Sequence, residues 1–90
     1  MFDDVNANRL DAALELLDAD PMMTVAGKAY MSQADIRNYF QGQVSKGVKY
    51  TVSGITVVGP IATFTLEYGT TKGKATAITD GSTITMLTLP

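Results

Sequence analysis

The fold of this chain is decided by residues 6–40, which read NANRLDAALELLDADPMMTVAGKAYMSQADIRNYF. Four apolar residues near the start of this stretch recur at the spacing of one helix face: Leu10, Ala13, Leu14 and Leu17. We expect the helix to begin at an Asn8 cap, because an Asn side chain accepts a hydrogen bond from the first turn. We expect it to end at Asp20-Pro21, because proline disfavours helical geometry in the residue before it.

Two short strands and a second helix are predicted in the rest of this stretch. The strands occupy residues 22–25 and 28–31, on either side of Ala26-Gly27. Ser32 opens the helix, because Ser-Gln-Ala-Asp places an acidic residue in the first turn after a capping hydroxyl. Gly47 follows as a C-terminal stop.

From Val48 onward apolar and polar residues alternate, which is the period of a β-strand. We predict strands at 48–57, 61–68, 74–79 and 83–89, with a bulge at Gly54 and a turn at Gly59-Pro60. Residues 70–73 are expected to form a loop, and Asp80-Gly81 a tight two-residue hairpin turn. Helices first and strands last predict one α+β domain over residues 1–90, a cone of N-terminal helices packed on a sheet with an apolar interior.

The composition narrows the class of protein. Apolar residues make up 46% of the chain and charged residues 18%, as in globular proteins. The chain has no cysteine, its first ten residues do not resemble a signal peptide, and no window approaches the ~18 apolar residues of a membrane span. We therefore expect a cytoplasmic protein without membrane association. Its basic residues are neither clustered nor interleaved with aromatic ones, so nucleic-acid binding is not expected.

Two motifs in the N-terminal half resemble a known family. Residues 8–20, NRLDAALELLDAD, are similar to the second helix of the nuclear transport factor two-like superfamily, which includes polyketide cyclase-like and ketosteroid isomerase-like proteins. Gly27 and residues 31–40, MSQADIRNYF, resemble the family's glycine, short strand and following helix, and the Asp80-Gly81 turn fits as well. The resemblance covers nearly the whole chain and implies a cystatin-like cone, a curved antiparallel sheet around helices with an apolar pocket inside.

The chain departs from the family at its start. Family members begin with a long helix that helps to close the pocket, whereas only about seven residues precede Asn8 here. We expect this shortened helix to leave apolar surface uncovered, and such a patch is typical of an interaction site. Because homodimers are common in the superfamily, the resemblance implies a homodimer.

The catalytic residues of the family have no counterpart in this chain. Similar isomerases carry a general-base carboxylate in the strand that matches residues 22–25 and a second acid near residues 75–77, and neither segment holds an acid here. Similar dehydratases use histidine, of which the chain has none, and similar epoxide hydrolases use an Asp-Arg-Asp set that Arg37 does not complete. Glu67 is expected on the strand face opposite Phe64. No cluster of His, Cys or carboxylates predicts a metal site, and no cofactor is implied.

Aromatic residues are the best candidates for a binding site. An aromatic side chain with a hydroxyl offers apolar contact and one directional hydrogen bond, which suits a small apolar ligand. The candidate ligand-binding residues are Tyr39, Tyr50, Phe64, Tyr68 and Met86. The alternative is that these residues, with Phe40, simply fill the core. The sequence favours that alternative for Phe40 and Phe64 and leaves it open for Tyr50 and Tyr68.

Three functions remain from different classes. The first is a non-catalytic homo-oligomeric module that binds a small apolar ligand in or at the mouth of the cone. The second is an interaction domain whose sheet pairs with a copy of itself or another protein, without a ligand. The third is an isomerase- or cyclase-like enzyme with unfamiliar catalytic residues, which the missing histidine and inward acids disfavour.

Overall fold

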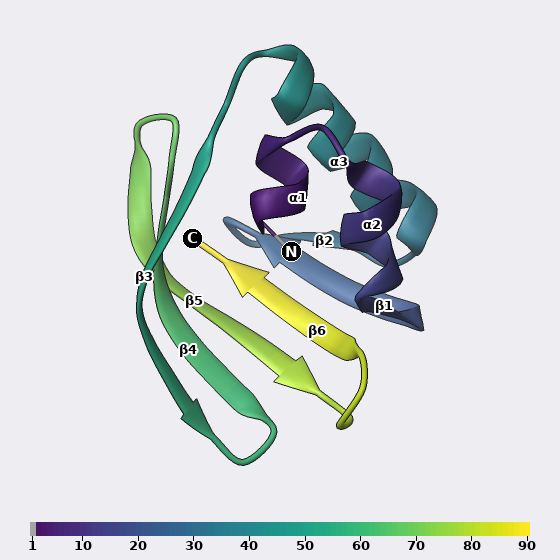
Figure 1. Ribbon diagram of the computed structural model, residues 1–90, viewed down its shortest axis with the longest axis vertical. Helices are drawn as coiled ribbons and strands as arrows, with labels where there is room; N and C mark the ends of the chain where they lie inside the picture. The colour runs from purple at the N-terminus through teal and green to yellow at the C-terminus, as the bar shows by residue number, and fades with distance from the viewer. Residues whose placement is uncertain (1) are drawn as a thin grey trace.

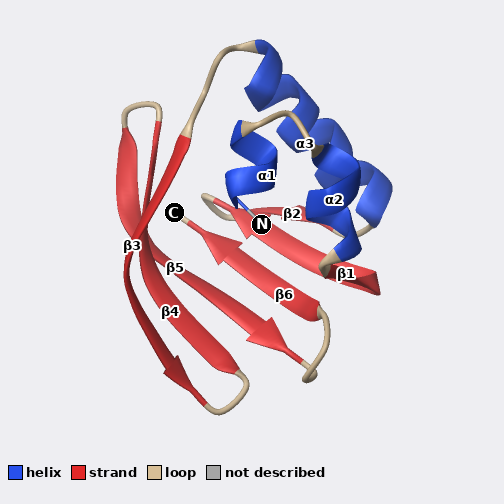
Figure 2. Ribbon diagram, in the orientation of Figure 1, coloured by secondary structure: helices blue, strands red, loops and turns tan. Residues whose placement is uncertain are grey.

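The computed structural model describes residues 2–90 as a curved sheet with helices gathered on its concave face (Figure 1). Its elements in chain order are α1 Phe2–Asn6, α2 Leu10–Glu15, β1 Leu17–Val25, β2 Lys28–Tyr30, α3 Gln33–Ser45, β3 Tyr50–Val58, β4 Ile61–Tyr68, β5 Thr71–Thr79 and β6 Ile84–Leu89. The helices lie over one end of the sheet, and the far ends of β3 and β4 extend beyond them (Figure 2). The predicted fold class, α+β with N-terminal helices on a curved sheet, is confirmed.

The six strands form one sheet in the order β2-β1-β6-β5-β4-β3. Four of the five neighbouring pairs are antiparallel, and the β1–β6 pair is parallel. The sheet is therefore mixed, and the expectation of a wholly antiparallel sheet is corrected at this one pair. Strands β2 and β3 are the two edges, which leaves the long strand β3 with one unpaired side.

The helix expected over residues 8–20 is wrong in both bounds. Asn8 has a left-handed backbone, φ 59°, and follows the last turn of α1, where Asn commonly ends a helix. Helix α2 then runs only over Leu10–Glu15, without a side-chain cap at Arg9. Strand β1 starts at Leu17 and contains Pro21, at a place where its pairing with β6 is irregular. An irregular stretch tolerates a residue that has no amide hydrogen to donate.

The second helix and the hairpin turn before it form as predicted, but the first strand of the hairpin begins at Leu17 instead of Met22 and the second ends at Tyr30. Strands β1 and β2 join at Ala26 and Gly27, whose φ values of 49° and 87° make a tight turn. The Ser32 hydroxyl accepts a hydrogen bond from the Asp35 amide at 3.1 Å, which caps α3. Gly47 ends the helix with φ 76°.

The connections in the second half differ from the predictions in two places. The bulge at Gly54 is confirmed, because the β3–β4 register shifts between Ser53 and Thr56. The loop predicted over residues 70–73 is wrong, since β5 already begins at Thr71 and pairs with Tyr68. The hairpin at Asp80 has a four-residue loop instead of a two-residue turn, and the Asp80 carboxylate accepts hydrogen bonds from the amides of Ser82 and Thr83.

The hydrophobic core lies between the helices and the concave face of the sheet. Its largest fully buried side chains come from every layer: Phe40, Met23, Ile36, Leu66, Leu87, Val5 and Pro21. The side chain of Asn6 joins α1 to β3 by pairing with the backbone of Tyr50, through its Nδ2 and Oδ1 atoms at 2.7 Å each. No helix within residues 2–90 is long and apolar enough to cross a membrane.

Candidate functional site

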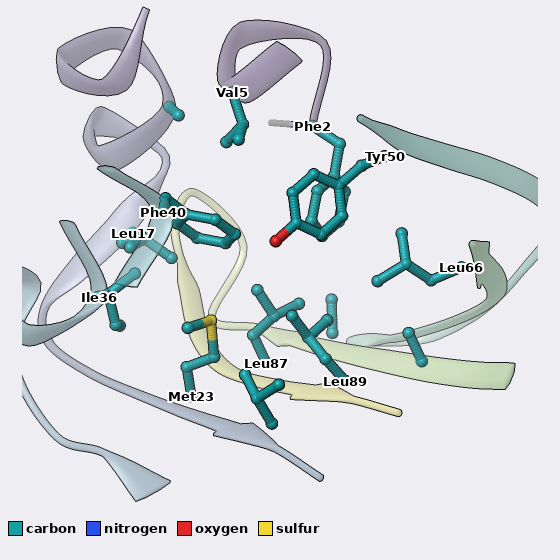
Figure 3. Packing of buried hydrophobic residues seen from close by; sticks show 14 of the residues in the cluster. Phe2, Val5, Leu17, Met23, Ile36, Phe40, Tyr50, Leu66, Leu87 and Leu89 are labelled. Carbon is teal, nitrogen blue, oxygen red and sulfur yellow. The ribbon is translucent and has the colours of Figure 1, made fainter. Parts of the chain in front are cut away.

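Tyr50 carries an unusual polar group in the middle of the core. Only 4% of the residue is exposed, because Asn6 holds the first residue of β3 against α1. Figure 3 shows its hydroxyl oxygen directed inward among apolar side chains, on the side of Phe40. Within residues 2–90 this oxygen has no hydrogen-bond partner of normal geometry, although the Tyr39 hydroxyl lies close enough to affect its pKa. Buried hydroxyls are usually bonded, so this atom is available to a polar group that enters the core.

Two further tyrosines surround Tyr50. Tyr68 is its cross-strand neighbour on β4, with ring centroids 5.0 Å apart, and the Tyr68 hydroxyl donates to the Pro90 carbonyl at 2.5 Å. Tyr39 on α3 packs against Phe40 at 5.4 Å. Burial raises the pKa of the Tyr50 hydroxyl above its ordinary value, and the neighbouring Tyr39 hydroxyl raises this pKa further. Burial likewise raises the pKa of Tyr68 to about 12.

These pKa directions decide what the tyrosines do chemically. A phenol whose pKa lies well above neutrality stays protonated at physiological pH. Tyr50 and Tyr68 are therefore neutral hydrogen-bonding groups there, and neither is suited to act as a general base.

An apolar groove of about 310 Å³ lies beside this cluster, on the concave face of the sheet that the helices leave uncovered. Its walls come from α1 and from four neighbouring strands: Phe2, Asp3, Val52, Ile55, Ala62, Phe64, Ala77, Ile84 and Leu87. Phe64, 6% exposed, forms part of the wall from β4. The Gly54 bulge shifts β3 by one residue, which places Ile55 on the same face as Val52.

Phe2 separates the groove from the tyrosines. Its ring centroid lies 5.1 Å from that of Tyr50 and 6.3 Å from that of Phe40 on the inner side. On the other side it lies 6.1 Å from the ring of Phe64 in the groove wall. Phe2 thus lines the groove and also packs against Tyr50, which is not itself a groove-lining residue.

The five predicted site residues do not form one pocket. Phe64 lines the groove, whereas Tyr50 lies in the core against Phe2, and the partly buried Tyr39 and Tyr68 pack against this core. Met86 is the exception, because it pairs in register with Met22 and Ile78 and lies on the face opposite Leu87. It is therefore placed outside both the groove and the core, and the prediction that it lines the cone is corrected.

Most of the groove-lining residues that the sequence analysis did not name could have been found from strand alternation. Val52, Ala62 and Ala77 lie on the same strand faces as their buried neighbours, so alternation alone locates them. Phe2 was not singled out from the sequence, because its contacts with Tyr50 and Phe64 are distant in the chain and carry no local signal. Glu67 is exposed on the face opposite Phe64, as predicted.

The structure offers weaker candidates for a metal site or a second binding site. Within residues 2–90 no three His, Cys, Asp or Glu residues are grouped to hold a metal ion. Two more open hollows of about 350 and 410 Å³ lie around α2, and both include Arg37, which forms an ion pair with Asp11. Their walls are more polar than those of the groove, and among residues 2–90 no buried unpaired side-chain group lies in them.

Comparison with solved structures identifies the architecture as the nuclear transport factor two-like, or cystatin-like, fold. An uncharacterized cystatin-fold protein from Novosphingobium aromaticivorans superposes with a TM-score of 0.84 at 11% identity, covering 97% of this chain and 88% of that one. A candidate polyketide cyclase from Sinorhizobium meliloti gives 0.81 at 19% identity, with 97% and 86% covered. SalBIII, an epoxide hydrolase/cyclase-like enzyme of pyran ring formation in salinomycin, gives 0.76 at 17% identity, with 97% and 81% covered.

These similarities concern the fold. No protein-family model matches the sequence, and no curated protein matches it. Because all three identities lie below 20%, the chemistry of this chain has to be argued from its own groove and side chains.

Proposed function

We propose that this chain is a non-catalytic module that binds a small apolar molecule in the groove between α1 and the uncovered part of the sheet. The observation that carries the proposal is the groove itself, about 310 Å³ with mostly apolar walls. This volume lies at the lower end of the roughly 300–1,000 Å³ of small-molecule sites. A ligand that fills the groove removes its apolar walls from water, which is favourable.

The buried hydroxyl of Tyr50 supports the same proposal from the inner side of Phe2. A hydroxyl without a partner in the core loses the hydrogen bonds that it would make in water. A ligand that displaces the Phe2 ring from Tyr50 would gain access to this donor. Tyr50 would then offer one directional hydrogen bond next to apolar walls.

Two features favour a module without catalysis. The chain has neither histidine nor cysteine, and the tyrosines remain protonated at neutral pH, so they do not act as general bases there. General acid–base catalysis near pH 7 is most efficient for a group whose pKa lies close to that pH. We place the module in the cytoplasm, and the location of a tagged chain in cells tests this.

Titration with the neutral dye N-phenyl-1-naphthylamine tests ligand binding. Its fluorescence is expected to rise on binding the wild-type chain, and the Ala62→Phe variant, which places a ring in the groove, is expected to bind at least about ten-fold more weakly. Thr63→Phe is the matched control, since it adds the same ring to the opposite face of β4. Absence of dye binding to the wild type, or equal binding by Ala62→Phe, contradicts the proposal.

Self-association is the second part of the proposal, and the edge strand β3 supports it. Three of its apolar side chains are exposed: Ile55 by 62%, Val57 by 66% and Val58 by 71%. Edge strands are usually protected by charges, proline or bulges, and Tyr50–Val58 contains neither a charge nor proline, although the Gly54 bulge interrupts it. We infer that two copies of β3 would pair without like-charge repulsion.

The same strand favours the second candidate function, an interaction domain that pairs with its own copy and binds no ligand. Sedimentation of the wild type at micromolar concentration is expected to give a dimer, and Val58→Lys is expected to give a monomer because a charge at an edge blocks pairing. Gln41→Lys adds the same charge on exposed α3 and is expected to leave the dimer intact. A wild-type monomer contradicts self-association, and a dimer that retains its mass in Val58→Lys contradicts the β3 interface.

A further inference from the structure

One charged residue lines the otherwise apolar groove. Of the nine residues in its walls, Asp3 alone is charged. It lies on α1 and is exposed to solvent. Within residues 2–90 no basic side chain pairs with it, whereas its neighbour Asp4 pairs with Arg9 at 3.2 Å. The groove is thus an apolar surface with one carboxylate at its rim.

The basic side chains around α1 contact groups other than Asp3. Arg9 contacts Asp4, and the Lys49 ammonium donates to the Asn6 carbonyl at 2.7 Å, at the other end of the helix. No lysine or arginine is among the groove-lining residues. A ligand with an anionic end therefore finds no counter-charge in the groove and meets the Asp3 carboxylate, whereas a cationic end finds a partner.

We propose that the groove selects small amphiphiles whose apolar body ends in one positively charged group, a primary alkyl- or arylalkylamine. This inference rests on the proposed function, since the apolar walls supply the binding and Asp3 supplies the discrimination. Apolar walls distinguish ligands by size and shape. The charge of the head group is therefore distinguished by Asp3.

The expected size of the discrimination is modest because Asp3 is exposed. Exposed ion pairs correspond to about a two- to five-fold change in an equilibrium constant. We expect an amine to bind about two- to five-fold more tightly than the alcohol of the same chain length. We expect the corresponding carboxylate to bind more weakly than the alcohol, because the like charge repels it. Both differences should shrink at high salt, which screens exposed charges.

Displacement of N-phenyl-1-naphthylamine by octylamine, octan-1-ol and octanoate tests the proposal at pH 7 and low ionic strength. The three competitors share one apolar body and differ in the charge of the head group. The wild-type chain is expected to rank them amine, alcohol, carboxylate in order of falling affinity. A carboxylate that competes as well as the amine overturns the proposal.

Variants at Asp3 separate the charge from the apolar contacts. Asp3→Asn is expected to equalise the amine and the alcohol, Asp3→Lys to reverse the order of amine and carboxylate, and Asp3→Glu to keep the wild-type order. Because Asp3 is exposed, these variants are expected to fold, which circular dichroism checks. Glu15→Gln removes one negative charge from α2 without touching the groove and is expected to keep the amine preference. An amine preference that persists in Asp3→Asn overturns the assignment to Asp3.

The experiment distinguishes the failure of this inference from the failure of the proposed function. Dye binding without any preference among the three head groups overturns the amine selectivity but still supports the binding of apolar molecules in the groove. Failure of the dye to bind the wild-type chain overturns both.

Discussion

The substitution Tyr50→Phe deletes one oxygen atom from the core and leaves the ring in place. The ring packs against Phe2 at 5.1 Å, Phe40 at 5.7 Å and Tyr68 at 5.0 Å, and Phe preserves all of these contacts. The lost hydroxyl is buried without a partner within residues 2–90. Burying such a group costs about 1–3 kcal/mol in protein mutational data. We therefore expect Tyr50→Phe to raise the free energy of unfolding by about 1 kcal/mol.

Tyr68→Phe is the matched comparison and is expected to have the opposite sign. Its hydroxyl donates to the Pro90 carbonyl at 2.5 Å, and Pro90 is held there because its ring lies over Gly73, where a side chain would not fit. Losing one intramolecular hydrogen bond lowers the free energy of unfolding by about 0.5–1.5 kcal/mol. Both variants remove a hydroxyl oxygen from neighbouring rings. The difference between their changes in the free energy of unfolding therefore reports whether that oxygen is hydrogen-bonded.

Urea unfolding at pH 7, followed by far-ultraviolet circular dichroism, measures both variants. The midpoint is compared at constant slope, because a changed slope indicates a changed denatured state. Stabilisation by Tyr50→Phe together with destabilisation by Tyr68→Phe is the predicted result. A loss of more than about 0.5 kcal/mol in Tyr50→Phe would refute the reasoning, since it would mean that water or the Tyr39 hydroxyl already bonds this oxygen.

Three further predictions concern the core, the alkaline range and a helix cap. Phe64→Ala is expected to lower the free energy of unfolding by about 3–5 kcal/mol, because Phe64 is only 6% exposed, and a urea-measured loss below about 1 kcal/mol would contradict its inward placement. Burial raises the pKa of Tyr68 from 10.0 to about 12 and that of Tyr50 in the same direction, so the unfolded chain loses these protons first. The contribution of these tyrosines to the free energy of unfolding is therefore expected to be complete below pH 10 and to fall from pH 10 towards pH 12. The fall is expected to be smaller in Tyr50→Phe. Thermal melts across this range measure it, and a melting temperature that does not change with pH would contradict the shifts. Ser32→Ala removes the cap on α3 and should cost about 1 kcal/mol, whereas Ser45→Ala, at the other end of the same helix, should cost much less.

The sequence predicted the β-strand half well because alternation reports directly on which face is buried. Phe64 and Leu66 on β4 are buried as the pattern requires, and Glu67 between Leu66 and Tyr68 is exposed. Gly54 located the bulge because its left-handed φ of 62° is a conformation that glycine adopts without strain. Turn lengths were less predictable: the Asp80 loop gained two residues because the Asp80 carboxylate bonds two following amides.

The N-terminal helix was mispredicted because its apolar spacing is satisfied by two different structures. Leu10, Ala13 and Leu14 are buried on α2 as expected, but Leu17 is buried by pairing with Ile84 in the sheet. Periodicity over seven residues does not distinguish these cases, and the deciding contact lies 67 positions away in the chain.

The candidate site was only partly predictable for the same reason. The tyrosines and Phe64 were named from their chemistry, and the structure places Phe64 in the groove and Tyr50 in the core against Phe2. Met86 was misplaced because its position depends on the register of β6 with β5, which the sequence of β6 alone does not determine. Asp3 was not singled out, because a charged residue near the start of a chain carries no signal of the groove that it lines.

Native mass spectrometry of the wild-type chain and Ala62→Phe, purified side by side under gentle conditions, tests the central claim most directly. The account predicts a wild-type dimer that carries additional mass of a few hundred daltons, and little or none of this mass on Ala62→Phe, whose groove is filled. Extra mass retained equally by both chains would place the ligand elsewhere. A wild-type chain that binds no small molecule, even after incubation with octylamine or N-phenyl-1-naphthylamine, would contradict the binding function.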